Sequence, residues 1–206
     1  MLLSLVDSLR CPAAHAESPL VLSADAWSGT RVMRGVLGCP VCHLRYPIEN
    51  GVVDFTSGSR PAPPAGAGET DATRLAAQLG LAEAGGIVLL TGRYASSVAA
   101  LLELVDVTCI LVDETVAGTD AAVTFRILER IPLAGNALRA AAVDDSRANA
   151  AFLGEVVRCV RPGGRLVAPA GSAQPEVVRV LARDSREWVG EVESTEPLTP
   201  LRRVTR

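Results

Sequence analysis

The sequence contains no lysine and few aromatic residues. All 20 of its lysine-plus-arginine residues are arginine, and Phe, Trp and Tyr together make up 3% of the 206 residues. The chain is nevertheless 49% hydrophobic, so its core must be built from Ala, Val and Leu. The formal net charge of -3 argues against a mainly electrostatic nucleic-acid binder, although a local basic face is left open.

Apolar runs long enough to cross a membrane are also lacking. Runs such as Gly86–Leu90 and Thr108–Val112 have the length of strands. Met1–Val6 is apolar, but it has no basic leader and is followed by Asp7 and Arg10, which does not fit a signal peptide. We therefore expect a cytoplasmic protein with no membrane association. In that compartment its five cysteines would be metal ligands or buried thiols rather than disulfides.

The chain divides into three segments by composition. Residues 1–56 hold most of the Cys and His, and residues 57–69 are rich in Pro, Gly and Ala, which is typical of a linker. From residue 70 to 206, short continuous apolar runs alternate with amphipathic helical patterns. Such alternation predicts a doubly wound, mostly parallel α/β sheet of the Rossmann-like class.

Individual elements of this sheet can be placed from apolar runs and capping residues. The expected strands are Ile87–Thr91, Val107–Val112, Thr124–Leu128, Leu138–Val143 and Arg165–Ala168. The expected helix caps are Thr70 or Asp71, Ser96 or Ser97, and Ser146. We expect the turn Arg161–Gly164 to end the helix after Ser146, a last helix near Pro175–Arg183, and a terminal pair formed by Glu187–Val192 and Leu201–Thr205.

A metal site is predicted near the amino terminus. Cys39 and Cys42 form a CxxC pair, and Cys11 with His15 offers a second pair upstream. Three thiolates and one imidazole on two short knuckles suit tetrahedral zinc. A redox CxxC would be expected in a thioredoxin-like βαβ unit, which the sequence lacks. His43 is an alternative fourth ligand, and a site with no fourth protein ligand is the remaining option.

The same region resembles a known family. The segments Leu5–Pro12, Leu37–Cys42 and Tyr46–Phe55 are similar to the small zinc-ribbon proteins that activate tRNA, rRNA and protein methyltransferases. The family usually has its second cysteine where this chain has Ala14, and His15 follows directly. The resemblance implies a zinc cofactor and a protein partner, either a methyltransferase or part of the translation machinery. Because such ribbons expose a strand edge for pairing, we expect an internal interface between the ribbon and the linked sheet.

The rest of the chain resembles class I S-adenosylmethionine-dependent methyltransferases. The resemblance rests on Phe152–Val167, with its Arg-Pro-Gly-Gly turn, and on Ile131–Val143. It implies a glycine-rich cofactor loop after the first strand, yet Ile87–Ser97 has a single glycine, Gly92, and no acidic residue. Arg93 and Tyr94 stand where the cofactor would need space. We therefore expect ordinary cofactor binding to be lost or much weakened.

Acidic residues follow two of the expected strands. The resemblance to class I methyltransferases implies that Asp113 binds the ribose hydroxyls of the cofactor, with Glu114 as a near alternative. The competing interpretation is a solvated acidic residue that caps the strand. For Asp144 and Asp145 we expect a helix cap or surface turn.

Two functions stay open from the sequence. One is a non-catalytic or regulatory methyltransferase-like protein, and the other is an active enzyme with an atypical loop that acts on RNA, protein or a small molecule. Cys109 and Cys159 fall on apolar faces and are expected in the core.

Overall fold

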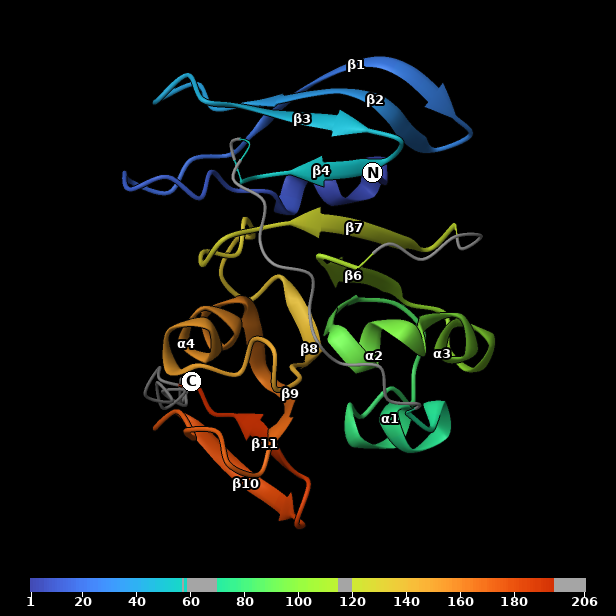
Figure 1. The fold of residues 1–206 in the computed structure, drawn as a ribbon, viewed down its shortest axis with the longest axis vertical. Coiled ribbons are helices and arrows are strands. Elements are labelled where there is room, and N and C mark those ends of the chain that lie inside the picture. The colour runs from blue at the N-terminus through green and yellow to red at the C-terminus, as the bar shows by residue number, and fades with distance from the viewer. Residues whose placement is uncertain (57, 59–69, 115–119, 195–206) are drawn as a thin grey trace, which may run out of the picture.

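The computed structural model describes residues 1–56, 58, 70–114 and 120–194 (Figure 1). In this part of the chain the strands form one 11-stranded sheet, in the order β1-β2-β3-β4-β7-β6-β5-β8-β9-β11-β10. The elements in chain order are the 3-10 helix η1 (Leu3–Ser8), β1 (Val21–Ser28), β2 (Arg31–Gly38), β3 (Arg45–Glu49), β4 (Val52–Asp54), α1 (Ala72–Gln78), β5 (Ile87–Thr91), α2 (Gly92–Ser96), α3 (Val98–Leu104), β6 (Thr108–Val112), β7 (Ala122–Arg126), β8 (Leu138–Ala142), α4 (Ala150–Cys159), β9 (Val160–Pro169), β10 (Val178–Arg183) and β11 (Glu187–Val192).

The centre of the sheet is parallel and doubly wound. Strands β7, β6, β5, β8 and β9 pair in parallel, whereas β11 and β10 close one end in antiparallel fashion. The chain passes from β5 outward to β6 and β7, then returns to β8 on the other side of β5. This order confirms the predicted Rossmann-like class and places a switch point between the carboxyl ends of β5 and β8.

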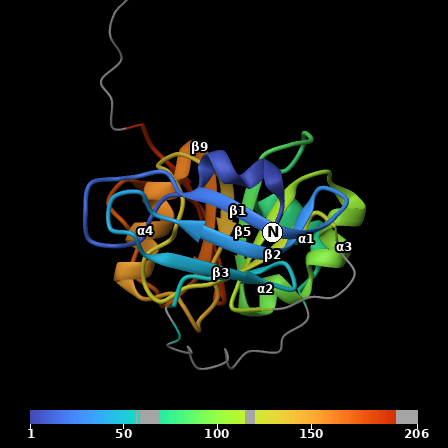
Figure 2. The same cartoon turned by 90° about the horizontal axis from the view of Figure 1, so that it is seen from above.

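Both faces of the parallel strands are buried. Alternate residues along β5 belong to different clusters: Leu89 packs in the cluster that contains α4, and Val88 and Leu90 pack in the cluster that contains α1, α2 and α3. Figure 2, seen from above, shows α4 on the opposite side of the molecule from α1 and α3. Burial on both faces explains why these strands are continuous apolar runs rather than alternating ones. Cys109 and Cys159 are both buried, as expected.

The amino-terminal ribbon, strands β1–β4, extends the same sheet. Its strands pair in antiparallel order, and β4 then pairs in parallel with β7, with Val53 opposite Phe125 and Asp54 opposite Arg126. The backbone N–H of Phe55 adds a bond of 2.8 Å to the carbonyl oxygen of Arg126. The Phe55 ring lies 5.4 Å from that of Phe125 in an edge-on arrangement. The expected internal interface between ribbon and sheet is thus present as a β-strand pair.

One predicted element has the wrong type. The expected helix near Pro175–Arg183 is wrong, because Val178–Arg183 is strand β10. It pairs with β11 through Val178 opposite Val192, and β11 also pairs with β9. Helical spacing in a short segment is a weak signal, and the available edge of β11 decides the outcome.

The surroundings of α4 also differ from expectation. Asn149, not Ser146, caps this helix, and its side chain accepts a hydrogen bond of 2.9 Å from the N–H of Phe152. The helix ends at Cys159, and Arg161–Gly164 lies inside β9 rather than in a turn before it. A register shift in the β8–β9 pair accommodates the extra residues.

Two expected segments fall on residues outside the described ranges. These are the linker at 57–69, apart from residue 58, and the strand at Leu201–Thr205. The boundaries 1–56, 57–69 and 70–206 therefore stay predictions. Among the helices of the described residues, none has the length and apolar character needed to cross a membrane.

We expect Phe125→Ala to lower the free energy of unfolding by about 3–5 kcal/mol, since it removes a buried ring at the junction of ribbon and sheet. Urea denaturation followed by circular dichroism measures this change. The matched control is Leu104→Ala, because Leu104 is 52% exposed. A loss below about 1 kcal/mol for Phe125→Ala would show that the junction contributes little to stability.

Candidate functional site

Four side chains from two separate knuckles meet beside the ribbon. The ligand atoms of Cys11, His15, Cys39 and Cys42 all lie within 4.8 Å of one another. The sulfur atoms of Cys11 and Cys42 are 3.7 Å apart, and Cys39 Sγ lies 3.4 Å from His15 Nε2. Tetrahedral zinc with ordinary bond lengths would set such sulfurs about 3.8 Å apart and such a sulfur–nitrogen pair about 3.6 Å apart. The donor set and its spacing therefore fit a zinc ion.

The second knuckle is shaped by backbone donors to sulfur. Cys39 follows β2, and its sulfur accepts hydrogen bonds from the N–H groups of Val41 at 3.4 Å and Cys42 at 3.5 Å. The turn closes at His43, whose backbone is left-handed with a φ of 59° and whose N–H donates to the Cys39 carbonyl oxygen. His43 is exposed and is not one of the four clustered residues, so the structure brings His15 rather than His43 to the site.

Neighbouring polar groups orient the first knuckle. His15 Nδ1 lies 2.6 Å from the carbonyl oxygen of Ala16, and this contact directs Nε2 toward the sulfurs. The N–H of Cys11 donates to the Ser18 carbonyl oxygen, which fixes the loop. The hydroxyl of Tyr46 lies 3.3 Å from the Cys11 sulfur, so β3 also supports the cluster.

The two buried thiols differ in acidity. Burial acts to raise the pKa of Cys39, but hydrogen bonds from the N–H groups of Cys42 and Val41 and from the thiols of Cys42 and Cys11 together outweigh it and lower that pKa to about 6. Burial raises the pKa of Cys11, and the Tyr46 hydroxyl only partly opposes the rise. The lowered pKa of Cys39 favours the thiolate, which is the form that binds metal.

A buried carboxylate lies against the junction of β5 and α2. Asp144 is 3% exposed, and its side chain accepts hydrogen bonds from Thr91 Oγ1 at 2.9 Å and Ser146 Oγ at 2.6 Å. Gly92 has a φ of 45°, and a Cβ added there would lie 1.9 Å from Asp144 Oδ2. Gly92 is therefore required by the close approach of Asp144. The expectation of a surface turn at Asp144 is wrong, because this side chain ties the ends of β5 and β8 together.

Asp113, at the end of β6, is paired with an arginine of the same chain. Its carboxylate forms an ion pair with Arg147 Nη2 and accepts a bond of 3.2 Å from the N–H of Ile127. Burial raises the pKa of Asp113, while the charge of Arg147 acts in the opposite direction. The Asp113 side chain is 8% exposed, so the interpretation as a solvated strand cap does not hold.

Sequence reasoning missed a buried carboxylate on β11. Glu187 accepts hydrogen bonds from Tyr94 Oη at 2.7 Å, Arg93 Nη2 at 3.2 Å, Arg74 Nη2 at 2.8 Å and Gln78 Nε2 at 2.7 Å. Arg93 and Tyr94 had been expected to occupy cofactor space, and the structure turns both toward Glu187. No local pattern signals this network, because its donors lie far from Glu187 in sequence.

We expect Glu187→Gln to lower the free energy of unfolding at pH 7 by about 1–3 kcal/mol. Burial acts to raise the pKa of Glu187, but its hydrogen bonds and the arginine charges outweigh burial and lower it. A carboxylate whose pKa is lower in the folded state stabilises the fold at pH values above its ordinary pKa, which is near 4.3. This stabilisation is lost as the pH falls through the pKa of the folded state. The difference from wild type should therefore shrink below about pH 4, as measured by urea denaturation at several pH values. Glu103→Gln, on the exposed side of α3, is the control, and an unchanged difference at acid pH would contradict the account.

Comparison with known proteins gives one family match. Residues 3–51 match the family described as Trm112p-like protein. No match was found among curated proteins. The match agrees with the ribbon resemblance described above.

Solved structures similar to the chain include several methyltransferases. One from Methanococcus maripaludis, a putative S-adenosyl-L-methionine-dependent methyltransferase, has a TM-score of 0.47 and 11% identity, covering 62% of this chain and 85% of that one. The antibiotic-resistance methyltransferase Kmr has a TM-score of 0.40 and 16% identity, covering 62% and 95%. Geranyl diphosphate methyltransferase has a TM-score of 0.40 and 17% identity, and covers 47% of this chain. The chain spans 42% of that enzyme's length. The chain therefore joins a segment similar to the Trm112p-like protein family, at residues 3–51, to a Rossmann-like α/β sheet.

Proposed function

We propose that the chain is a methyltransferase-like protein with a structural zinc ribbon and a non-catalytic or regulatory role. This proposal rests on the side chain that fills the switch point between the carboxyl ends of β5 and β8. Doubly wound sheets bind their ligands at such points, outside the carboxyl ends of the strands. Here Asp144 lies against Gly92 and is bonded to Thr91, so a buried carboxylate stands where a cofactor loop would approach its ligand.

The ion pair of Asp113 supports the same function. Ribose hydroxyls would have to compete with Arg147 for the Asp113 carboxylate, and Arg147 also donates to the Ile127 carbonyl oxygen. Hydrogen bonds to charged groups contribute about 1.5–3 kcal/mol each, so this competition opposes cofactor binding. Gly92 is the single glycine of Ile87–Ser97, which adds a second obstacle, because the other backbone amides of this segment could not approach a ligand closely without Cβ clashes.

A zinc ion would have a structural role in this proposal. Cys11, His15, Cys39 and Cys42 would supply four protein ligands, which is the closed arrangement of structural sites. The residue before the first ligand, Arg10, donates its N–H to the carbonyl oxygen of Pro132 in the loop after β7. Zinc would thus fix both the ribbon and its contact with the sheet.

A protein partner is part of the proposal. The match to the Trm112p-like family over residues 3–51 supports a methyltransferase or a component of the translation machinery as that partner. In this chain β4 already pairs with β7. A partner would therefore bind a surface other than the edge of β4.

An active methyltransferase with an atypical loop is the second candidate. The position of Asp113 directly after β6, beside the switch point, favours it, because a carboxylate there could reach a ribose once Arg147 moved. This candidate predicts measurable cofactor affinity, whereas the first predicts none.

The zinc proposal predicts different results for the two histidines. We expect His15→Ala to lose most of its zinc, because it removes a ligand atom that lies 3.4 Å from Cys39 Sγ. His43→Ala, the matched control, should keep wild-type zinc content. Native mass spectrometry and elemental analysis of freshly purified protein measure both. Full zinc in His15→Ala together with loss in His43→Ala would reverse the ligand assignment.

The non-catalytic proposal predicts no binding of S-adenosylmethionine or S-adenosylhomocysteine. Calorimetry on zinc-loaded wild-type protein should give no binding heat at ligand concentrations of about 100 μM, which corresponds to an affinity weaker than about −5.5 kcal/mol. Micromolar binding of either ligand would overturn the proposal and favour the active enzyme. In that event Asp113→Ala should weaken the affinity, and an unchanged affinity would place the cofactor elsewhere.

A further inference from the structure

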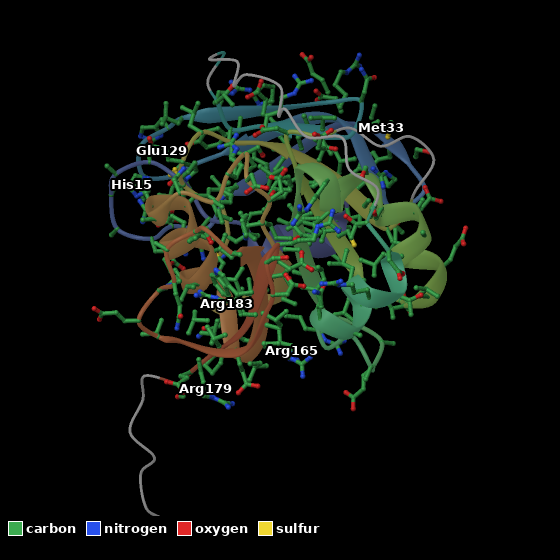
Figure 3. All side chains as sticks on the ribbon, turned by 60° about the horizontal axis from the view of Figure 1, so that its bottom comes forward. His15, Met33, Glu129, Arg165, Arg179 and Arg183 are labelled. Carbon is green, nitrogen blue, oxygen red and sulfur yellow. The ribbon has the colours of Figure 1, made fainter. Side chains whose placement is uncertain are left out.

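A cavity of 720 Å³ lies between the ribbon and the carboxyl ends of the parallel strands. We call it the ribbon–sheet cavity. Its walls include Leu44, Tyr46 and Phe55 from the ribbon side, and Leu128, Arg130 and Asn149 from the sheet side. Its volume falls within the range of about 300–1,000 Å³ that small-molecule sites occupy. Figure 3 shows the lining residue Glu129 on the same side of the molecule as His15.

The cavity has an apolar body. Tyr46 and Phe55 are buried and pack on each other with ring centroids 5.0 Å apart. Leu44 and Leu128 also line the cavity but are 43% and 48% exposed. Two half-exposed leucines facing a shared cavity, one from each part of the chain, would gain from burial against an apolar ligand.

The polar groups of the cavity include unused donors. Arg130 gives one N–H to the carbonyl oxygen of Ala13, and its planar guanidinium carries further N–H groups. Asn149 uses its side-chain oxygen to cap α4, which directs its amide NH₂ elsewhere. Arg147 is committed to Asp113. The charge of Arg147 is therefore balanced, and the other charged side chains of the lining are Arg130 and Glu129.

Backbone hydrogen bonds fix the ribbon side and the sheet side of the cavity relative to each other. Arg10 N–H donates to the Pro132 carbonyl oxygen at 3.0 Å, and Ala134 N–H donates to the Ser8 carbonyl oxygen at 2.9 Å. Leu9 and Leu133 form a β-bridge between these two bonds. A cavity with walls fixed in this way is pre-formed, which lowers the cost of binding a ligand.

We propose that the ribbon–sheet cavity binds a small organic anion with an apolar body of about the size of an aromatic ring. Arg130 and the amide of Asn149 hold the anionic head group, and Leu44 and Leu128 close over the apolar part. This site goes beyond the proposed function and does not depend on whether S-adenosylmethionine binds.

Methyl NMR on leucine-labelled, zinc-loaded full chain tests the proposal. The probes are 3-phenylpropionate, 3-phenylpropyl phosphate and the neutral 3-phenylpropanol. We expect at least one anionic probe to shift the methyl signals of Leu44 and Leu128 in a saturable way, in the millimolar range usual for so small a ligand. The neutral alcohol should bind about tenfold more weakly, because it lacks a charged acceptor for Arg130. The two anions distinguish a carboxylate from a phosphate head group.

Arg130→Met keeps most of the apolar stem and removes the guanidinium. It should weaken the anionic probe about tenfold and leave the alcohol unchanged. Arg183→Met, on the exposed strand β10, is the matched control and should bind as wild type. Zinc content and the leucine methyl signals outside the cavity report whether each variant folds. Absence of saturable shifts at Leu44 and Leu128 with both anions, or equal binding of anion and alcohol, would overturn the proposal. Calorimetry with the cofactor tests the proposed function and these titrations without cofactor test the cavity, so the two proposals fail separately.

Discussion

Two backbone pairs, Val53 with Phe125 and Asp54 with Arg126, join the ribbon to the parallel sheet. Through them an antiparallel ribbon and a parallel, doubly wound sheet become one continuous sheet with a shared core on one face. The edge of β7 is thereby covered, which removes a row of unpaired backbone groups that could otherwise template association. The Cys11 knuckle, the loop after β7 and the cavity between them all owe their relative positions to this junction.

The carboxyl ends of the central strands are occupied by the chain's own polar groups. Asp144 links β5 to β8, the Asp113–Arg147 pair links β6 to the loop after β8, and Glu187 gathers donors from α1 and α2. Each carboxylate is buried and bonded, and buried charges are tolerated only when they are paired in this way. Hydrogen bonds and an ion pair thus tie the carboxyl ends of β5, β6 and β8 to neighbouring segments.

Local sequence was informative where one physical cause dominates. Burial on both faces makes a parallel strand apolar throughout, so Ile87–Thr91 could be recognised directly. The short spacing of Cys39 and Cys42 predicted a knuckle because two thiolates on one turn face the same point. Partners distant in sequence decided the rest. Val178–Arg183 is a strand because it pairs with β11. Asp144 is buried because it accepts a hydrogen bond from Thr91 and packs against Gly92. These partners cannot be read from the local sequence pattern.

The parallel junction also sets an order of events during synthesis. Val53 emerges from the ribosome long before Phe125, its partner, so the edge of β4 is complete but uncovered while the intervening residues are made. The four clustered cysteine and histidine residues, by contrast, are all made by residue 42, and Tyr46, which contacts Cys11, follows soon after. A nascent chain could therefore capture its metal early and close its sheet late. In the interval between those two steps, the unpaired edge of β4 is open to chaperones or to other nascent chains.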